Sequence, residues 1–574
     1  SSCVRMKGAL RPWRFVYALI AAATLCLRPR RGQGSQQAAF VELALRSKLC
    51  FPVALTRSLP SRHLHAASQG PPASQTRNGC FAISVRLLLL GFTLRSSRTG
   101  LHASSRRSAS RQVQSTESRH QCLPLRISGK WYDISGWLDA HPGGAWVLDF
   151  ARGRDVTALF YAIHWHTGSR AQSILERLPQ LDKADAVEAG AEPYTFAKDG
   201  APEPLQPSSE KSAFVRELHE FLSEEFPTPE SMKATPSHWA LVFLALTCTV
   251  SCWWLWFQGN LLATAVLPLV HWLLLSLTFH EACHSSLSTN PAINYIFQFT
   301  CHPIYENVFI WYTQHLVSHH QYTNDHNYDS DVNIMGTTRL AHATPMHEEL
   351  RPTLGLYGFT QFMTKGCLST IGGSFIGPLW AYDDRPCPPF TYCTMPAPPG
   401  LSKLELALSI VPSALVLLWP IVSFGFDPLR ALFLSLWPFV GSSMIWFVMA
   451  FTSHVQEECQ PTSSLSRPGR LADTCWWAWQ AETSLDYSVG SPFWTSATAG
   501  LNSQSLHHLV PNICLCHFPR IYGRYAEICA RHGVRLNQRP NLLSAIAGLF
   551  SFAQVLNPEV AFAGESRVGT AGQR

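Results

Sequence analysis

The stretch LLATAVLPLVHWLLLSLTFHEACH, residues 261–284, decides the expected fold. Its first 19 residues, Leu261–Phe279, contain no charged side chain and are interrupted only by His271, which we interpret as a core histidine bonded to a neighbouring helix. A helix rises about 1.5 Å per residue, so this run is long enough to cross a hydrocarbon layer about 30 Å thick. The run continues into His280 and His284, which lie four residues apart and share one helix face. The sequence predicts a membrane helix whose end directs two imidazoles toward one centre.

Three further apolar runs complete two helical hairpins. Trp239–Phe257 is joined to the first run by three residues, and Leu404–Phe424 is followed closely by Leu432–Phe451. Basic residues precede the first of the four spans, and the short loop after it has none. This asymmetry places the N-terminal side in the cytosol, and four spans return the C-terminal side to the same face.

The composition indicates a chain that is part soluble and part membrane-embedded. Of the 574 residues, 46% are hydrophobic and 14% are Asp, Glu, Lys or Arg, whereas an average soluble protein has about 25% charged residues. The apolar content excludes disorder over the whole length. The 17 cysteines form no CxxC pair, so we expect mostly reduced, buried thiols rather than a disulfide framework or a zinc site.

The basic charge is confined to an N-terminal arm, residues 1–120. This arm contains 19 Lys and Arg but 2 Asp and Glu, while the rest of the chain has a balance of −10. A nucleic-acid-binding body is therefore not indicated. The apolar run Val16–Leu27 is similar to the core of a signal peptide, and the Arg- and Ser-rich arm has the composition of a transit peptide. Two interpretations of residues 1–120 remain open: they are a targeting arm, or they are translated sequence ahead of the true start.

A second functional pattern lies upstream of the spans. The sequence His141-Pro142-Gly143-Gly144 places an imidazole on a tight turn, where proline fixes one φ and the glycines let the backbone approach a flat ligand. His164 follows 23 residues later, after an apolar stretch. Two axial imidazoles make a six-coordinate haem iron that carries electrons and has no open position. His166 stays open as the alternative second ligand.

This segment resembles cytochrome b5. The likeness rests on the HPGG sequence, on the entry strand Tyr132–Ile134 and on the stretch GRDVTALF, residues 153–160. It implies a small α+β domain that binds haem b through His141 and His164.

Two more histidine clusters accompany the pair at the end of the second span. One is HLVSHH, residues 315–320, and the other is QSLHH, residues 504–508, after the last span. Histidine at a membrane boundary is costly unless its polar atoms are satisfied, and imidazole is a good ligand for iron. Seven histidines on one predicted face therefore indicate a centre of two irons that activates O2.

The three clusters resemble the histidine boxes of the membrane-bound di-iron fatty acid desaturases. More narrowly, they resemble front-end acyl desaturases with an N-terminal cytochrome b5 domain. The motifs HxxxH, HxxxHH and QxxHH carry the likeness, with Gly500–Asn502 before the third motif and Leu509–Pro511 after it. It covers about residues 125–555. It implies an α+β cytochrome b5-like haem domain followed by an all-α four-helix transmembrane desaturase domain with a cytosolic di-iron cap.

The resemblance also implies the ligand set. The expected catalytic and metal-binding residues are His280, His284, His315, His319, His320, Gln504, His507 and His508, with His454 as a further metal ligand. Glu281, Asp329 and Asp331 are expected either to orient ligating imidazoles or to be solvated loop acids. The family usually has an aromatic residue at 503 and Ile-Glu at 505–506, where this chain has Ser503, Ser505 and Leu506. These departures affect contacts around the ligands or the substrate register, but not the ligand types.

The combined interpretation is an O2-dependent oxidoreductase that inserts a cis double bond into a polyunsaturated acyl chain. By resemblance, the new bond lies between an existing one and the carboxyl end. Electrons are expected from a cytochrome b5 reductase through haem b to two iron ions. The expected partners are a fatty acyl lipid or acyl-CoA, O2 and membrane lipid, and no nucleic acid. A sphingoid long-chain-base desaturase, an acyl hydroxylase and a non-catalytic haem-carrying membrane protein are the alternatives.

The expected location is the endoplasmic reticulum membrane with a cytosolic catalytic face, or a plastid membrane if the arm is a transit peptide. The expected domains are the arm at 1–120, the haem domain at 121–185, a linker with an amphipathic helix at 186–237, the desaturase domain at 238–556 and a tail at 557–574. Phe214, Leu218, Phe221 and Leu222 have helical spacing in the linker. Their apolar face lies either at a membrane interface or against the neighbouring domain.

Overall fold

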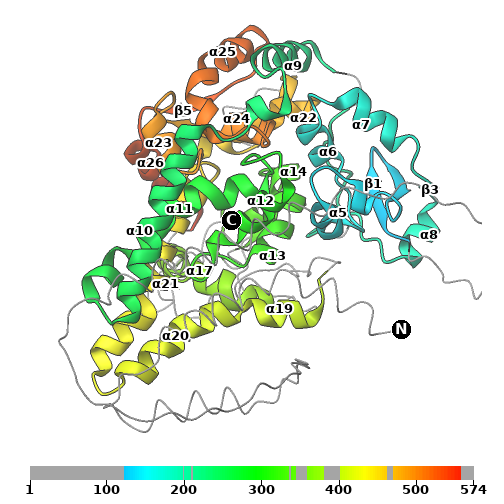
Figure 1. Cartoon of the computed structure of the whole chain (residues 1–574). Coiled ribbons are helices and arrows are strands. Elements are labelled where there is room, and N and C mark those ends of the chain that lie inside the picture. Colours follow the sequence, from blue (N-terminus) through cyan, green and yellow to red (C-terminus); the bar gives the residue numbers. More distant parts are fainter. Residues whose placement is uncertain are drawn as a thin grey trace, which may run out of the picture. The chain divides into compact units, whose positions relative to one another are not determined.

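The computed structural model describes residues 122–197, 200–208, 211–334, 338–343, 358–379, 401–461 and 469–557 (Figure 1). These residues belong to one compact unit, Ser115–Arg574. The arm at 1–120 and nearly all of the tail at 557–574 lie outside the described residues, so the two predictions for the arm stay predictions.

The N-terminal part of this unit is a small α+β domain. Its three-stranded antiparallel sheet has the order β1 (Pro124–Ile127), β2 (Lys130–Asp133) and β3 (Gln180–Leu181). Its helices are η1 (Leu138–Ala140), α5 (Ala145–Ala151), α6 (Thr157–Ile163), α7 (Gly168–Leu175) and α8 (Lys183–Glu188). The α+β prediction for this segment is confirmed.

The predicted amphipathic helix is α9, Ala213–Glu225, and it begins at Ser212, whose side chain accepts a hydrogen bond from the backbone N–H of Val215. Its apolar face is covered by protein: Phe214, Leu218 and Leu222 are buried in one core cluster. The helix packs on α25, Phe518–Arg531. Of the two predicted locations, packing against the neighbouring domain is correct.

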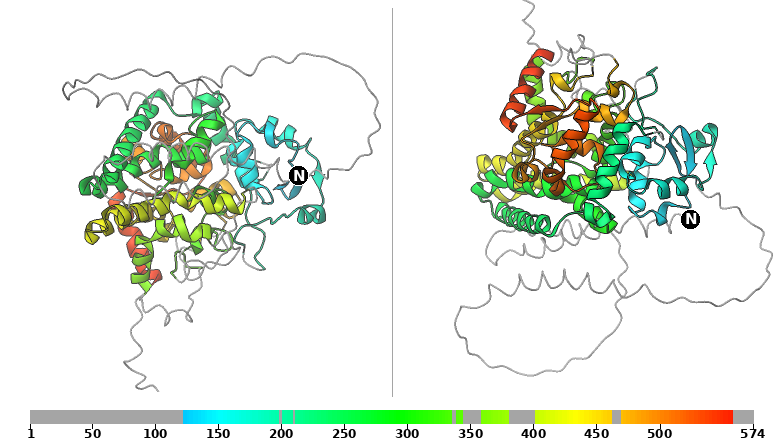
Figure 2. Two further views of the ribbon diagram at one scale, coloured as in Figure 1. Left: turned by 60° about the horizontal axis from the view of Figure 1, so that its bottom comes forward. Right: turned by 90° about the horizontal axis from the view of Figure 1, so that it is seen from above.

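Four helices are long and apolar enough to cross a membrane, which confirms the four predicted spans among the described residues. They are α10 (Pro236–Phe257), α11 (Leu261–Cys283), the pair α19 (Lys403–Ser409) and α20 (Val411–Phe424), and α21 (Pro428–Thr452). Helix α10 packs on α11, α11 on α21, and α20 on α21; Figures 1 and 2 show the green and yellow hairpins side by side. His271 lies inside the bundle and donates from Nε2 to the carbonyl of Thr300 at 2.7 Å, as predicted for a core histidine.

The two hairpin turns meet at the end of the bundle away from the histidine motifs. Gly259 has a φ of +74° in the first turn, and a Cβ there would meet the ring of Phe424 at 2.7 Å. Its carbonyl accepts a hydrogen bond of 2.7 Å from Nη2 of Arg430 in α21. This contact ties one hairpin to the other at the end opposite the ends of α11 and α21 that carry metal-binding histidines.

Short helices form a cap on those ends. Between the hairpins lie α12 (Pro291–Phe297), η3 (Gln298–Cys301), α13 (Val308–Trp311), η4 (Tyr312–His319), α14 (His320–Tyr322), α15 (Ser330–Asn333), α16 (Gly358–Cys367), α17 (Ser369–Ile371) and η6 (Gly372–Ile376). After α21 come η7 (Glu457–Cys459), η8 (Leu471–Asp473), α22 (Trp476–Glu482), α23 (Pro492–Ala497), α24 (Gln504–Leu509), η9 (Leu515–His517), α25 and α26 (Leu542–Leu556). Two short parallel strands, β4 (Leu485–Tyr487) and β5 (Asn537–Arg539), join this cap.

Candidate haem and metal centres

The His141 turn shows why glycine follows the proline. A Cβ on Gly143 would lie 2.9 Å from Cε1 of the His141 ring, and Gly144 has a φ of +93°, a conformation that favours glycine. The Nδ1 atom of His141 lies 3.3 Å from the carbonyl oxygen of Gly144. Gly143 therefore also makes room for the imidazole of His141 itself. The sequence prediction gave the glycines only the role of letting the backbone approach a flat ligand.

The ring that faces His141 is that of His164. The two ring centroids are 6.3 Å apart, and His164 donates from Nδ1 to the carbonyl of Phe160 at 2.9 Å, which leaves its Nε2 as an acceptor. Because a first-row metal binds an imidazole nitrogen at about 2 Å, this separation leaves room for one iron between the rings. Burial lowers the pKa of both imidazoles, to about 4 for His141, and favours the neutral form that ligates. His166 instead packs its ring on Trp165.

The predicted metal ligands come together in two adjoining groups. The five-histidine group consists of His280, His284, His315, His320 and His507, whose ligand atoms all lie within 4.8 Å of one another. The three-histidine group consists of His319, His454 and His508, again within 4.8 Å. Every histidine of both groups is buried. The structure therefore brings together residues that the sequence spreads over more than 220 positions.

Gln504 lies in the three-histidine group. Its amide Nε2 is 2.9 Å from Nε2 of His454 and 3.0 Å from Nε2 of His508. The side chain is thus within reach of the same centre as the imidazoles. A metal would be bound by the amide oxygen, since the amide nitrogen carries no available lone pair.

A wide helical turn explains how the second motif serves both groups. Helix η4, Tyr312–His319, is a π-helix, and its pattern continues as the N–H of His320 bonds to the carbonyl of His315, five residues earlier. This i→i+5 spacing puts both residues on one face, toward the five-histidine group. His319 then points to the other group. An ordinary α-helical turn would have paired His315 with His319 instead.

Hydrogen bonds hold the imidazoles of the three-histidine group in one tautomer. His319 donates from Nδ1 to both carboxylate oxygens of Asp329 at 3.1 Å, and His508 Nδ1 donates to Oε1 of Gln480 at 3.0 Å. His454 Nδ1 lies 3.3 Å from the carbonyl of Thr483. With the proton on Nδ1, Nε2 of His454 and of His508 keeps its lone pair for a metal, whereas His319, whose pKa the neighbouring carboxylates raise, would give up its second proton when a metal binds.

The electrostatics of both groups fit metal ions. Burial, and then the neighbouring imidazoles, lower the pKa well below the ordinary value for His284, His315, His320, His507 and His508. Four Nε2–Nε2 distances in the five-histidine group are 3.0–3.2 Å. Each neutral imidazole has one N–H, and Nδ1 of His284, His315 and His320 has no hydrogen-bond partner among the residues that the structure describes. A divalent cation among the Nε2 atoms would satisfy this set of lone pairs.

His319 differs from its neighbours because it has carboxylates beside it. Burial opposes its charged form, but Asp329 and Asp331 outweigh burial and raise the pKa of His319 to about 9. Asp331 is the more distant partner, at 3.6 Å, and it also accepts from Nε2 of Gln314. Glu281, the other acid expected to orient an imidazole, accepts instead from the Ser286 hydroxyl and from the backbone N–H of Leu515.

Sequence reasoning missed two residues that hold the site together. Gln480 accepts hydrogen bonds from Thr323 and His508. Asn324, at a φ of +58°, donates from its amide to the carbonyls of His454, Cys459 and Thr483 and from its N–H to Asp329. The signal available for Asn324 in the sequence was an amide residue four positions after the second motif. Gln480 had no comparable signal in the sequence.

The departures from the family pattern have local partners of their own. Ser505 donates from its hydroxyl and its N–H to the two carboxylate oxygens of Asp486, at 2.5 and 2.9 Å. Tyr522 donates to the same carboxylate at 2.6 Å. Leu506 is fully buried in the core cluster that also contains the α9 face. The changed residues therefore fasten α24 to β4 and α25.

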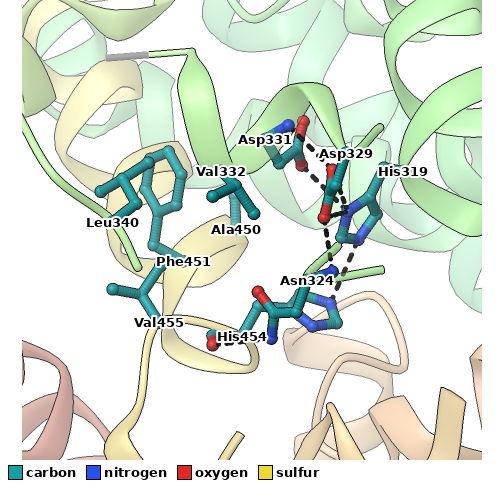
Figure 3. Close-up of a pocket in the computed structure, with 10 residues that line it drawn as sticks. All are labelled: His319, Asn324, Asp329, Asp331, Val332, Leu340, Ala450, Phe451, His454 and Val455. Carbon is teal, nitrogen blue, oxygen red and sulfur yellow. Dashed lines mark hydrogen bonds and ion pairs between the residues drawn. The ribbon is translucent and has the colours of Figure 1, made fainter. Parts of the chain in front are cut away.

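A pocket adjoins the three-histidine group (Figure 3). Figure 3 shows a polar side with His319, Asp329 and His454 and an apolar side with Phe451 and Val455. Leu340, Val332 and Ala450 extend the apolar side.

The haem domain contacts the cap close to both groups. The side chains of Trp165 and Asn512 are joined by a hydrogen bond of 3.1 Å, and Asn512 in turn donates to the carbonyl of Ile163 at 2.8 Å. Gln321 donates to the carbonyl of Asp155 at 2.8 Å. Phe150 packs its ring against Phe309. These contacts fix the haem domain beside the cap.

Together, the fold and the two centres define a membrane oxidoreductase with its own electron-carrying haem domain. The model of the fatty acid desaturase family matches residues 251–540, and that of the cytochrome b5-like heme/steroid binding domain matches residues 111–181. The first match spans half of the chain, so the chain belongs to the fatty acid desaturase family. It is an iron-dependent fatty acyl desaturase with a haem-binding cytochrome b5 domain, embedded in a membrane.

Relatives with curated names agree with this class. An acyl-lipid omega-13 desaturase of Chlamydomonas reinhardtii is 28% identical over 73% of this chain and 90% of its own length. A Delta(5) fatty acid desaturase A of Dictyostelium discoideum is 26% identical over 74% and 88%. An acyl-lipid (8-3)-desaturase of Mortierella alpina is 24% identical over 76% and 94%.

Proposed function

We propose that this chain is a front-end desaturase that acts on polyunsaturated acyl chains, with two irons held by the two histidine groups. The observation that carries the proposal is the composition of the three-histidine group, in which the amide of Gln504 lies beside His454 and His508. A neutral amide is a weaker iron ligand than imidazole. The two groups therefore present different ligand fields on either side of one centre.

The proposed ligand roles follow the geometry. His280, His284, His315, His320 and His507 would hold one iron, and His319, His454 and His508, with Gln504, the other. His141 and His164 would be the axial ligands of haem b. When bound, the haem carries single electrons and the irons activate O2 for removal of two hydrogens from adjacent acyl methylenes.

The chain's own residues supply orientation and exclusion of water. Asp329, Gln480 and the Thr483 carbonyl keep the proton on Nδ1 of the imidazoles that they contact, so each Nε2 stays directed at the centre. Phe451 and Val455 would contact the acyl chain where it passes the imidazoles. A bent, unsaturated chain held in register there would present one pair of methylenes to the irons, and positioning of this kind sets which bond reacts.

The electron path and the membrane orientation belong to the same proposal. Electrons would come from a cytochrome b5 reductase and cross from the haem domain where Trp165, next to His164, meets Asn512. The protein would lie in the endoplasmic reticulum membrane, and the ends of α11 and α21 that carry the metal-binding histidines would face the cytosol. The proposed domain bounds are 121–185 for the haem part and 238–556 for the desaturase part, which overlap the matched ranges 111–181 and 251–540.

The test is product analysis in yeast that expresses the full chain. Cells are fed defined saturated and polyunsaturated fatty acids, and new double bonds are located by gas chromatography and mass spectrometry. The expected product has a new cis double bond on the carboxyl side of an existing one. A product whose only double bond arose in a saturated chain would refute the front-end assignment. A hydroxylated chain or a desaturated sphingoid base would replace it by one of the alternative activities.

A further inference from the structure

The loop after the third histidine motif contains two cysteines that the desaturase site does not use. Cys514 is fully buried and Cys516 is half-buried, and they flank the buried Leu515. The backbone N–H of Cys514 donates to the carbonyl of Met232 at 2.8 Å, and that of Leu515 donates to Glu281 at 2.9 Å. These bonds hold the loop against the segment just before α10, which contains Met232, and against the end of α11, which contains Glu281. Both cysteines are free thiols.

A histidine from a distant part of the chain completes this cluster. The two sulfurs and a ring nitrogen of His238, in the first turn of α10, all lie within 4.8 Å of one another. His517, directly after Cys516, is buried as well and interacts with the Cys516 sulfur, but it lies outside the set of ligand atoms within 4.8 Å of one another. The cluster thus consists of two thiols and one imidazole with a second imidazole next to it, and it shares no residue with the two histidine groups.

Both imidazoles are held in the tautomer that a metal requires. His238 donates from Nε2 to the carbonyl of Leu277 at 2.9 Å, and His517 donates from Nε2 to the carbonyl of Lys233 at 2.9 Å. A carbonyl oxygen only accepts, so in each ring the proton is on Nε2 and Nδ1 keeps its lone pair. Metal-binding histidines commonly have their second nitrogen fixed in this way.

The surroundings favour a thiolate at Cys516, whereas burial raises the pKa of the Cys514 thiol well above its ordinary value. The hydrogen bond from Cys514 lowers the pKa of the Cys516 thiol, and the contact with His517 lowers it further. The ammonium of Lys233 is held nearby, where it donates to the carbonyls of Ser285 and Asn512 at 3.0 Å each. A thiolate is the form of cysteine that binds metals.

We propose that Cys514, Cys516, His238 and His517 form a structural zinc site. Two thiolates and two imidazoles are the donor set of closed, tetrahedral zinc sites, which use all four positions for protein ligands. The ion would join the start of the first membrane helix to the loop that follows α24. It would thereby hold the third histidine motif in place without taking part in the reaction. The absence of a CxxC pair had argued against zinc. The proposed site instead takes three of its four ligands from one loop, with a Cys-Leu-Cys pair, and the fourth, His238, from 276 positions before Cys514.

The test is X-ray absorption at the zinc edge on the full-length protein purified in detergent with its haem and iron. The expected spectrum contains sulfur at about 2.3 Å together with nitrogen at about 2.0 Å, from about one zinc per chain. The sulfur signal is essential because zinc in a histidine group would show nitrogen alone. A zinc spectrum without sulfur, or no zinc, would overturn the proposal.

Matched variants assign the sulfur signal. The double variant Cys514→Ser with Cys516→Ser should lose it while the haem spectrum and the iron content are retained. Cys529→Ser, a buried thiol in α25 outside the cluster, should keep it. If the sulfur signal survives the double variant, the site is elsewhere.

A second measurement keeps the test decisive if the double variant does not fold. In the wild-type protein, Cys514 and Cys516 should resist alkylation until a chelator is added, and zinc release to a metallochromic dye should accompany their labelling. Mass spectrometry identifies the labelled peptide. Labelling without a chelator, or a disulfide between the two cysteines, would overturn the proposal. Because its readouts are metal and thiol chemistry, failure of the proposed front-end activity would leave this result unaffected.

Discussion

The indole N–H of Trp165 donates a hydrogen bond of 3.1 Å to the side-chain oxygen of Asn512, 347 positions along the chain. Trp165 directly follows His164, the ring that faces His141, and Asn512 lies four residues after His508 of the three-histidine group. One contact therefore connects the two candidate redox centres through a short run of the chain on each side.

Trp165→Phe should slow electron transfer from the haem domain to the desaturase domain. The substitution keeps an aromatic ring but leaves the buried oxygen of Asn512 without its donor, which costs about 1–3 kcal/mol. The measurement is the rate at which reduced haem is reoxidised in the presence of O2 and substrate, by stopped-flow absorbance. Trp137→Phe, in the same domain, serves as the control. An unchanged rate in Trp165→Phe would show that electrons cross elsewhere.

His141→Ala and His164→Ala should each abolish the low-spin haem spectrum, because each removes one axial imidazole. His166→Ala should leave that spectrum intact, since its ring packs on Trp165 and away from the facing pair. Absorbance spectra of the oxidised and reduced full-length proteins distinguish these outcomes. Loss of the spectrum in His166→Ala with retention in His164→Ala would reverse the assignment.

Asp329→Asn should lower desaturation about 10–100-fold, the range found when a partner of a metal-binding histidine is changed. The amide is a weaker acceptor for the Nδ1 proton of His319 than the carboxylate, whose two oxygens lie at 3.1 Å. Asp331→Asn is the matched control, because its contact with His319 is longer, at 3.6 Å. Iron content and product yield are both measured. Equal effects of the two substitutions would contradict a specific role for Asp329.

Gln504→His should reduce activity on polyunsaturated chains and should not convert the enzyme to one that acts on saturated chains. The imidazole is bulkier than the amide between His454 and His508, and it leaves the apolar residues Phe451 and Val455 unchanged. His508→Ala should remove activity while leaving the haem spectrum intact, because the centres lie in separate domains. Fatty acid profiles and haem spectra test both variants together. Activity of Gln504→His on saturated acids would mean that this residue sets the substrate class.

The stability that depends on Asp486 should fall as the pH rises from about 4 to about 6. Burial raises the pKa of Asp486 to about 6, above the unfolded value of about 3.9. The folded state therefore binds the proton more tightly, and its advantage is full below about pH 4 and lost above about pH 6. Two pKa units correspond to about 3 kcal/mol. The measurement is thermal unfolding of wild type and Asp486→Asn across this range. The wild type should lose stability relative to the variant as the pH rises. A difference that does not depend on pH would contradict it.

The four spans and the main motifs are properties of short windows of sequence. Leu261–Phe279 had to be a membrane helix because it has no charged side chain and a helix satisfies its backbone N–H and C=O groups internally. The turn at His141 follows from proline and two glycines in succession, and HxxxH at 280–284 follows from the helical repeat. Each of these predictions needed the residues of one window and no information on its neighbours.

The assignment of ligands to two groups was decided by tertiary structure. HxxxHH does not say that His315 and His320 share a face, because that depends on the π-helical turn of η4, which the surrounding packing sustains. Gln480 and Asn324 became part of the site through partners that are far away in the sequence.

The chemistry of this protein could be predicted from sequence, since the residue types that bind haem and iron stand in recognisable local patterns. Which side chains meet depends on the packing of the whole chain. The contact of Trp165 with Asn512 and the cluster of His238 with Cys514 each join segments more than 250 positions apart. Such contacts form because helices bury their apolar faces against one another, and burial is non-directional. The pairings that result depend on the shape of the whole core and leave no periodic signal in either segment.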